Sequence, residues 1–176
     1  MKRWFSFLMA LVVYAILHEG LHAVFASFFG EYQAFHIRPY GLEVTFNTPT
    51  AEREGFQWAL ISGMSNLTTI LVGYLLLAFA GRIAQLSNLW LKSILYYMTF
   101  LFLLLDALNL SIGPFLYGGD VHGIARGLGV HHYLIQFVFL IVLLINRELI
   151  AQKLMPMFNI RVENPVFKPW IRLPIK

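Results

Sequence analysis

Two histidines and a glutamate in the first apolar stretch have the spacing of a metal-binding helix. The sequence His18-Glu19-Gly20-Leu21-His22 is an HExxH motif. Residues four apart lie on the same face of a helix, so the two imidazoles can bind one zinc ion. Glu19 can then reach a zinc-bound water as a general base. The chemistry that this spacing predicts is metal-assisted hydrolysis.

The placement of this motif strengthens the prediction. It lies in an apolar stretch over about residues 4–29, which is long enough to cross a membrane as a helix. Ionisable side chains inside such a helix are costly, and they are functional candidates by default. A chance HExxH is expected on the order of once in a hundred chains of this composition. The alternative interpretation is that the three polar side chains only form hydrogen bonds to neighbouring helices.

A catalytic zinc usually has three protein ligands and an open position for water, so a third ligand must come from elsewhere in the chain. Asp120 is the favoured residue, because Gly118 and Gly119 precede it and allow a close approach of the backbone. Asp106, in the middle of an apolar stretch, ranks second. The further candidates are His122, Glu43 and His36. The residues expected near the membrane interface are His36, His122, His131 and His132.

The composition indicates a protein embedded in a membrane. Of the 176 residues, 59% are hydrophobic and 12% are charged, and the mean hydropathy is +0.68. Such a chain cannot cover an apolar interior with polar surface in water. The absence of cysteine excludes disulfides, thiolate nucleophiles and cysteine-based zinc sites. The net charge of +4 comes from basic residues in the termini and connections, which favours contact with lipid headgroups and argues against nucleic acid as a partner.

Four apolar stretches are long enough to span a membrane, over about residues 4–29, 56–80, 89–110 and 132–150. Gly30 and Gly81 are expected to end the first two helices, and Gly113 with Pro114 to break the third. No small-residue cleavage site follows the first stretch, so we interpret it as a retained helix rather than a signal peptide. The predicted fold is all-α and integral to the membrane, with about four transmembrane helices and a short β-hairpin between the first two.

The hairpin is predicted from the polar segment between the first two helices. Its sequence FHIRPYGLEVTFNT has the pattern of strand, turn and strand, with Pro39, Tyr40 and Gly41 in the turn. The unpaired edge of such a hairpin could accept an extended peptide as an added strand. The alternative is a surface hairpin that only caps the helix bundle.

The segment between the third and fourth helices is rich in glycine and begins with a helix breaker. Backbone of this kind is tolerated at membrane depth only where protein or a water-filled cavity satisfies it, so a re-entrant or cavity-lining loop is expected. A short helix after Asp120 is predicted to end near Gly127 or Gly129. Residues 1–150 then form a membrane-embedded core, and the basic, proline-containing residues 151–176 form a tail along the membrane surface.

Three features together resemble the site-2 protease family of intramembrane zinc metalloproteases, in a small branch with little beyond the core. The first is the HExxH motif inside an apolar helix. The second is GMSN, from Gly63 to Asn66, which is similar to the Gly-x-x-Asn element of that family. The third is the stretch with Asn109, Pro114 and Asp120, which resembles the family's stretch ending in an aspartate zinc ligand. The resemblance covers about residues 15–144.

This resemblance implies a zinc endopeptidase that cuts transmembrane or membrane-adjacent segments of other proteins. His18, His22 and Asp120 would be the zinc ligands, with Glu19 as the base. Asn66 and Asn109 would hold substrate or stabilise the oxyanion. The chain departs from the family pattern in its glycine at the third motif position, in a longer stretch from Asn109 to Asp120, and in the lack of a proline after Gly63. It contains no PDZ or nucleotide-binding domain, which leaves substrate recruitment unexplained.

Two other functions fit the same residues. One is an inactive metal-binding scaffold or regulator in the membrane. The other is a small metal or proton transporter component that uses His18, Glu19 and Asp106, although four spans without an inverted repeat argue against it.

The chain is expected to be a multi-pass protein of the cell membrane. Its orientation there is predicted differently by two criteria. The positive-inside rule places both termini in the cytoplasm and the segment with Arg38, Arg53 and Arg126 on the other side. The family resemblance instead implies a zinc site nearer the cytoplasm. The basic residues that the positive-inside rule places on the same side as the termini are Lys2, Arg3, Arg82, Lys92, Arg147 and Lys153.

Overall fold

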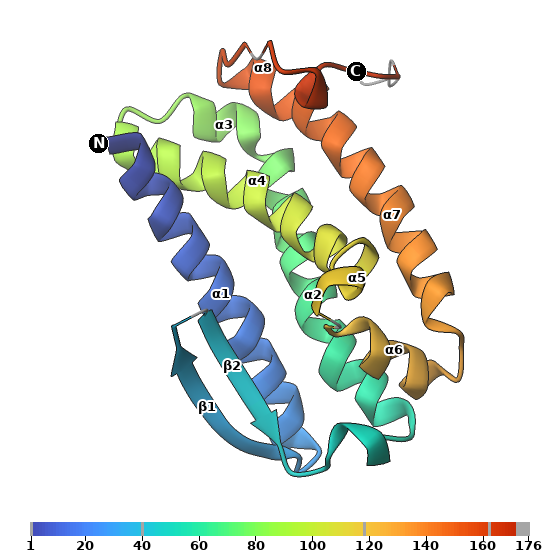
Figure 1. The fold of residues 1–176 in the computed structure, drawn as a ribbon. Helices are drawn as coiled ribbons and strands as arrows, with labels where there is room; N and C mark the ends of the chain where they lie inside the picture. The colour runs from blue at the N-terminus through green and yellow to red at the C-terminus, as the bar shows by residue number, and fades with distance from the viewer. Residues whose placement is uncertain (1, 40, 118, 162, 172–176) are drawn as a thin grey trace.

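The computed structural model describes residues 2–39, 41–117, 119–161 and 163–171. Four long helices dominate it: α1 (Lys2–Phe28), α2 (Phe56–Ala78), α4 (Leu89–Ser111) and α7 (His132–Leu149) (Figure 1). Within the described residues, four helical segments are long and apolar enough to cross a membrane, which confirms the four predicted stretches. The segments are Trp4–Phe28, Phe56–Ala78, Leu89–Ser111 and His132–Met157.

Helix α4 is the centre of the bundle. It packs against α1, α2 and α7, and α1 and α7 lie on opposite sides of it (Figure 1). Its crossing with α2 is close, because a Cβ atom at Gly73 would lie 3.1 Å from backbone atoms of Phe102 and Leu103. This contact brings the polar face of α2 alongside α4.

The predicted hairpin is present. Strands β1 (Tyr32–Arg38) and β2 (Gly41–Phe46) are antiparallel, with Phe35 opposite Val44. Strand β2 packs along α1, and the side chain of Val44 is buried. Tyr40 of the predicted turn lies outside the described residues. A short 3-10 helix, η1 (Thr50–Glu52), leads from the hairpin towards α2.

The glycine-rich segment after α4 forms two short helices, α5 (Pro114–Tyr117) and α6 (Val121–Leu128). Gly129 ends α6 in the left-handed conformation, with φ of +66°, as predicted for this stretch. Helix α6 packs tightly on α2. A Cβ at Gly123 would lie 2.0 Å from Oγ of Ser62, and a Cβ at Gly127 would lie 2.2 Å from the backbone nitrogen of Ala59.

Two helix ends differ from the sequence-based expectation. Helix α2 ends at Ala78, and Gly81 lies inside a further short helix, α3 (Ala80–Ala84), instead of closing α2. The chain leaves helical geometry at Phe79, with φ −92° and ψ 4°. The fourth span does not stop near residue 150, because η2 (Ile150–Leu154) and α8 (Met155–Met157) extend it.

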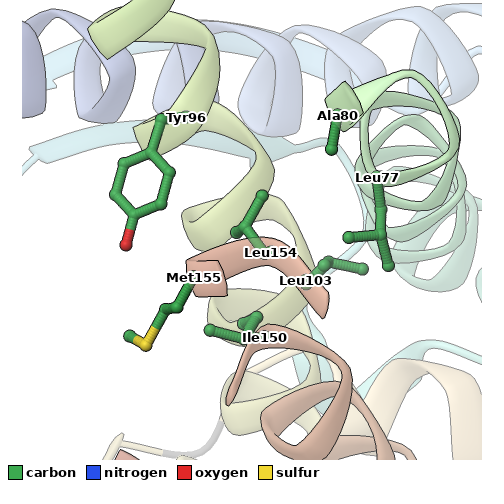
Figure 2. Packing of buried hydrophobic residues seen from close by; sticks show 7 residues of the cluster. All are labelled: Leu77, Ala80, Tyr96, Leu103, Ile150, Leu154 and Met155. Atoms are coloured by element: carbon green, nitrogen blue, oxygen red, sulfur yellow. The ribbon is translucent and has the colours of Figure 1, made fainter. Parts of the chain in front are cut away.

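A hydrophobic cluster explains both differences. It joins the end of α2, the start of α3, the middle of α4 and the extension of α7, so these segments bury one another (Figure 2). The buried members of this cluster are Leu77, Ala80, Tyr96, Leu103, Ile150, Leu154 and Met155.

Beyond the cluster, the described tail folds back onto α7. Nε of Arg147 donates to the carbonyl of Val166 at 2.6 Å, and the amide of Trp170 donates to Glu148 at 3.0 Å.

Candidate metal centre

The two histidines of the HExxH motif point into the interior of the bundle from consecutive turns of α1. Their side chains are buried, and their Nε2 atoms lie 3.2 Å apart. This is the arrangement that the spacing of four residues predicts for one face of a helix.

Asp120, at the start of α6, completes a triangle with these imidazoles. Its Oδ2 lies 3.5 Å from Nε2 of His18, and its Oδ1 lies 3.4 Å from Nε2 of His22. A zinc ion bound tetrahedrally at about 2.0–2.1 Å would hold its donors ~3.3–3.4 Å apart. The separations of 3.2–3.5 Å are close to this value, with each imidazole facing a different oxygen of the Asp120 carboxylate. Among the described residues, these three form the one group of three or more His, Asp or Glu close enough to share an ion.

The outer nitrogens of both imidazoles have partners that leave Nε2 available for a metal. Nδ1 of His22 lies 2.7 Å from the carbonyl oxygen of Ile61, which can only accept, so Nδ1 carries the proton. Nδ1 of His18 lies 2.9 Å from Oδ1 of Asp106, in a contact whose angle departs from that of a hydrogen bond. A carbonyl or carboxylate behind each histidine is typical of metal sites, where it orients the ring.

Asp106, the second-ranked ligand candidate, lies behind His18 and outside the ligand triangle. It is fully buried in α4. Its carboxylate accepts a hydrogen bond of 2.5 Å from the hydroxyl of Tyr14 and another from the hydroxyl of Thr69. The two donors come from α1 and α2, so this carboxylate joins three helices at the level of the site.

Asn66 and Asn109 both donate to the same oxygen of Asp120. The distances from their amide nitrogens to Oδ2 are 2.9 Å and 3.1 Å. Asn66 also donates to the carbonyl of Ser62, and its own oxygen accepts from Asn109. These contacts support a role in orienting Asp120. Their predicted contact with substrate or oxyanion stays a prediction.

The two imidazoles stabilise the charge of Asp120. Burial alone opposes ionisation of this carboxyl, but the imidazoles of His22 and His18 outweigh burial and hold its pKa well below the usual range. The carboxylate is the form of this side chain that binds a metal.

Glu19 and the three candidate ligands line a cavity of about 680 Å³. Its other walls come from β2, Asn109 and the loop with Tyr117 and Gly119. The Glu19 side chain is partly exposed, and the backbone amide of Val44 lies against its carboxylate. The carboxylate that was predicted as the base thus lies on the wall of a cavity large enough to hold water molecules.

The other sequence candidates lie outside the ligand triangle. Glu43 forms an ion pair of 3.0 Å with Arg38 on the hairpin, and Nε2 of His36 lies 3.4 Å from the hydroxyl of Thr45. His122 lines a neighbouring cavity together with Asp120. The rings of His131 and His132 stack where α7 begins, with centroids 4.5 Å apart.

Three polar residues at the site were not predicted from the sequence. The hydroxyl of Ser65 lies 2.8 Å from Nε2 of His22, next to the ligand triangle. Tyr14 and Thr69 hold Asp106. Their spacing carried a usable signal, because Tyr14 precedes His18 by one helical turn and Thr69 follows Ser65 by one turn.

Comparison with models of protein families, with curated proteins and with solved structures found no match to this chain.

Proposed function

We propose that this protein is a zinc endopeptidase that hydrolyses membrane-embedded or membrane-adjacent segments of other proteins. The observation that carries the proposal is the triangle of His18, His22 and Asp120, with donor separations of 3.2–3.5 Å and Glu19 on the wall of the same cavity. This set of donors lies among four helices that are apolar enough to cross a membrane. A metal site of two histidines and one carboxylate with an adjacent glutamate suits hydrolysis.

The chemistry is divided between the metal and the residues around it. A bound zinc ion would supply Lewis acidity and would lower the pKa of a coordinated water. Glu19 would accept the proton of the attacking water and return it to the leaving amine. Asp106, Asn66 and Asn109 would hold His18 and Asp120 in position while the reaction proceeds.

The hairpin supports a substrate that binds in extended form. Leu42, Val44 and Phe46 of β2 line the cavity beside Glu19. A strand edge next to the candidate base could pair with the backbone of an unwound substrate segment. Unwinding is required because the amides of a membrane helix are already hydrogen-bonded.

The first test is the metal content of the protein purified in detergent, measured by mass spectrometry. We expect nearly one zinc per chain in the wild type and its loss in both His22→Ala and Asp120→Ala. Cleavage is then tested with a panel of synthetic single-span peptides, whose fragments are identified by mass spectrometry. Glu19→Gln should retain zinc and lose cleavage.

Each result has a distinct meaning. Cleavage by Glu19→Gln would show that the proposed base is wrong. A folded wild type that neither carries nor takes up zinc would overturn the zinc enzyme. Zinc lost in His22→Ala but retained in Asp120→Ala would move the third ligand away from Asp120.

A further inference from the structure

A second cavity adjoins the metal cavity on the far side of Asp120. It has a volume of about 470 Å³. Phe46, Tyr117, Gly119 and Asp120 line both cavities, so the two share a wall that includes a candidate metal ligand. A peptide that lies across the metal site and leaves it past Asp120 would enter this second cavity.

The second cavity contains two arginines that come from different elements. Arg53 lies between η1 and α2, and its guanidinium lies over the rings of Phe46 and Trp58, at 4.7 Å and 4.6 Å from their centroids. Its Nε donates to the carbonyl of Thr48 at 3.1 Å. The aromatic rings and this hydrogen bond hold the half-buried guanidinium in one orientation.

Arg126 reaches the same place from the last turn of α6. Its side chain is exposed and donates to the carbonyl of Thr50. Both arginines are therefore attached to the loop of residues 48–53, and both also line the pocket beside Gly55, together with Glu54. The loop holds two cationic groups at one end of the cavity.

The charges of this pair are not neutralised by an ion pair within the described part of the chain. Glu31 attracts Arg53, but its carboxylate accepts hydrogen bonds from the amide and the hydroxyl of Thr48. Burial lowers the pKa of Arg53, the attraction of Glu31 opposes this effect, and the smaller repulsion of Arg126 adds to it. An anion between the two guanidinium groups would remove the repulsion.

We propose that Arg53 and Arg126 form a subsite for an acidic side chain of the peptide substrate, next to the position of the bond that is cut. This inference rests on the proposed function and adds a selectivity to it: substrates with Asp or Glu on that side of the bond. Guanidinium groups suit carboxylates because they can donate two parallel hydrogen bonds. A peptide carboxylate is favoured over a lipid phosphate, because the cavity shares a wall with the metal site.

The test measures binding on a protein that cannot cut. Zinc-loaded Glu19→Gln is immobilised in detergent and exposed to a synthetic mixture of short peptides of randomised sequence, and the retained peptides are identified by mass spectrometry. We expect enrichment of peptides with Asp or Glu, and about tenfold weaker binding when the preferred Glu is replaced by Gln. Adding Arg53→Gln or Arg126→Gln should abolish this preference, and adding Arg126→Glu should shift it towards Lys and Arg.

The controls separate charge selection from folding and from lipid binding. Arg82→Gln removes an exposed arginine in α3, at the other end of the bundle, and should leave the preference unchanged (Figure 1). A retained pool without acidic enrichment, or no retained peptide, overturns the subsite. The subsite is also overturned if both arginine variants lose bound phosphatidylglycerol while their preference for acidic peptides stays unchanged. The proposed hydrolysis fails separately, when the wild type cuts none of the single-span peptides.

Discussion

The carboxylate of Asp106 contacts residues of two other helices at once, Tyr14 and His18 of α1 and Thr69 of α2. It is fully buried, and the imidazole that it contacts is a candidate ligand. A buried carboxylate in this position fixes the ring of the histidine and increases its basicity towards a metal. At the scale of single residues, the side chains behind the candidate ligands are thus held by defined contacts, as the ligands themselves are.

Replacing Asp106 by asparagine tests whether this carboxylate supports metal binding by His18. Asp106→Asn keeps the shape of the side chain and removes its charge, so we expect zinc affinity to fall by about 10- to 100-fold. Affinity is measured by competition with a chromophoric chelator. Tyr14→Phe, which removes only one hydrogen bond to Asp106, should have a smaller effect. Equal zinc affinity in wild type and Asp106→Asn, at equal thermal stability, would exclude a role of this carboxylate in metal binding.

Asn109 allows its two predicted roles to be separated. If it orients Asp120, as the contact of 3.1 Å supports, Asn109→Ala should weaken zinc binding by about tenfold. If it stabilises the oxyanion, zinc affinity should stay unchanged and kcat should fall at saturating zinc, by about 100-fold or more. We expect the first result. Measuring both quantities on the same preparation decides between the roles.

At the scale of elements, the position of Asp120 depends on how closely α6 packs on α2. Gly123 and Gly127 allow this approach, because a side chain at either position would collide with Ser62 or Ala59. Asp120 directly precedes α6, so a displacement of the helix would carry the carboxylate away from the histidines.

A larger side chain at Gly127 is therefore expected to impair metal binding from a distance. Gly127→Val should lower both the melting temperature in detergent and the zinc content, since its Cβ would lie 2.2 Å from the backbone of Ala59. Gly81→Val is the matched control, because nothing lies within 4 Å of a Cβ at Gly81. Full zinc content in a destabilised Gly127→Val would show that α6 does not position Asp120.

The elements also show which features a sequence can predict. The HExxH face, the four apolar helices, the hairpin and an end of α6 near Gly127 or Gly129 follow from local spacing and composition, and all are present. The position of Asp106 behind His18, the start of α3 after Phe79 and the docking of the tail on Arg147 were not predicted. Each of these depends on contacts between residues far apart in the chain, which local patterns do not encode.

At the scale of the whole molecule, the two ends of the helix bundle differ in their charged residues and in the elements that form them. The beginning of α1 lies at the same end as the tail, and the hairpin and α6 lie at the other (Figure 1). The metal centre is in the later half of α1, nearer the hairpin end. Arg147 is buried in an ion pair with Glu148, so it contributes less to the charge bias than its sequence position suggests.

Cysteine labelling in intact cells tests the orientation directly, because the chain has no cysteine of its own. Glu52→Cys places one exposed thiol beside the hairpin, and Glu163→Cys places one in the tail. The positive-inside rule predicts that a membrane-impermeant maleimide labels Glu52→Cys and labels Glu163→Cys only after permeabilisation. The cysteine-free wild type is the blank. The opposite pattern would place the metal centre nearer the cytoplasm, the orientation that the family resemblance implies, and the cleaved substrate segments would then face that compartment.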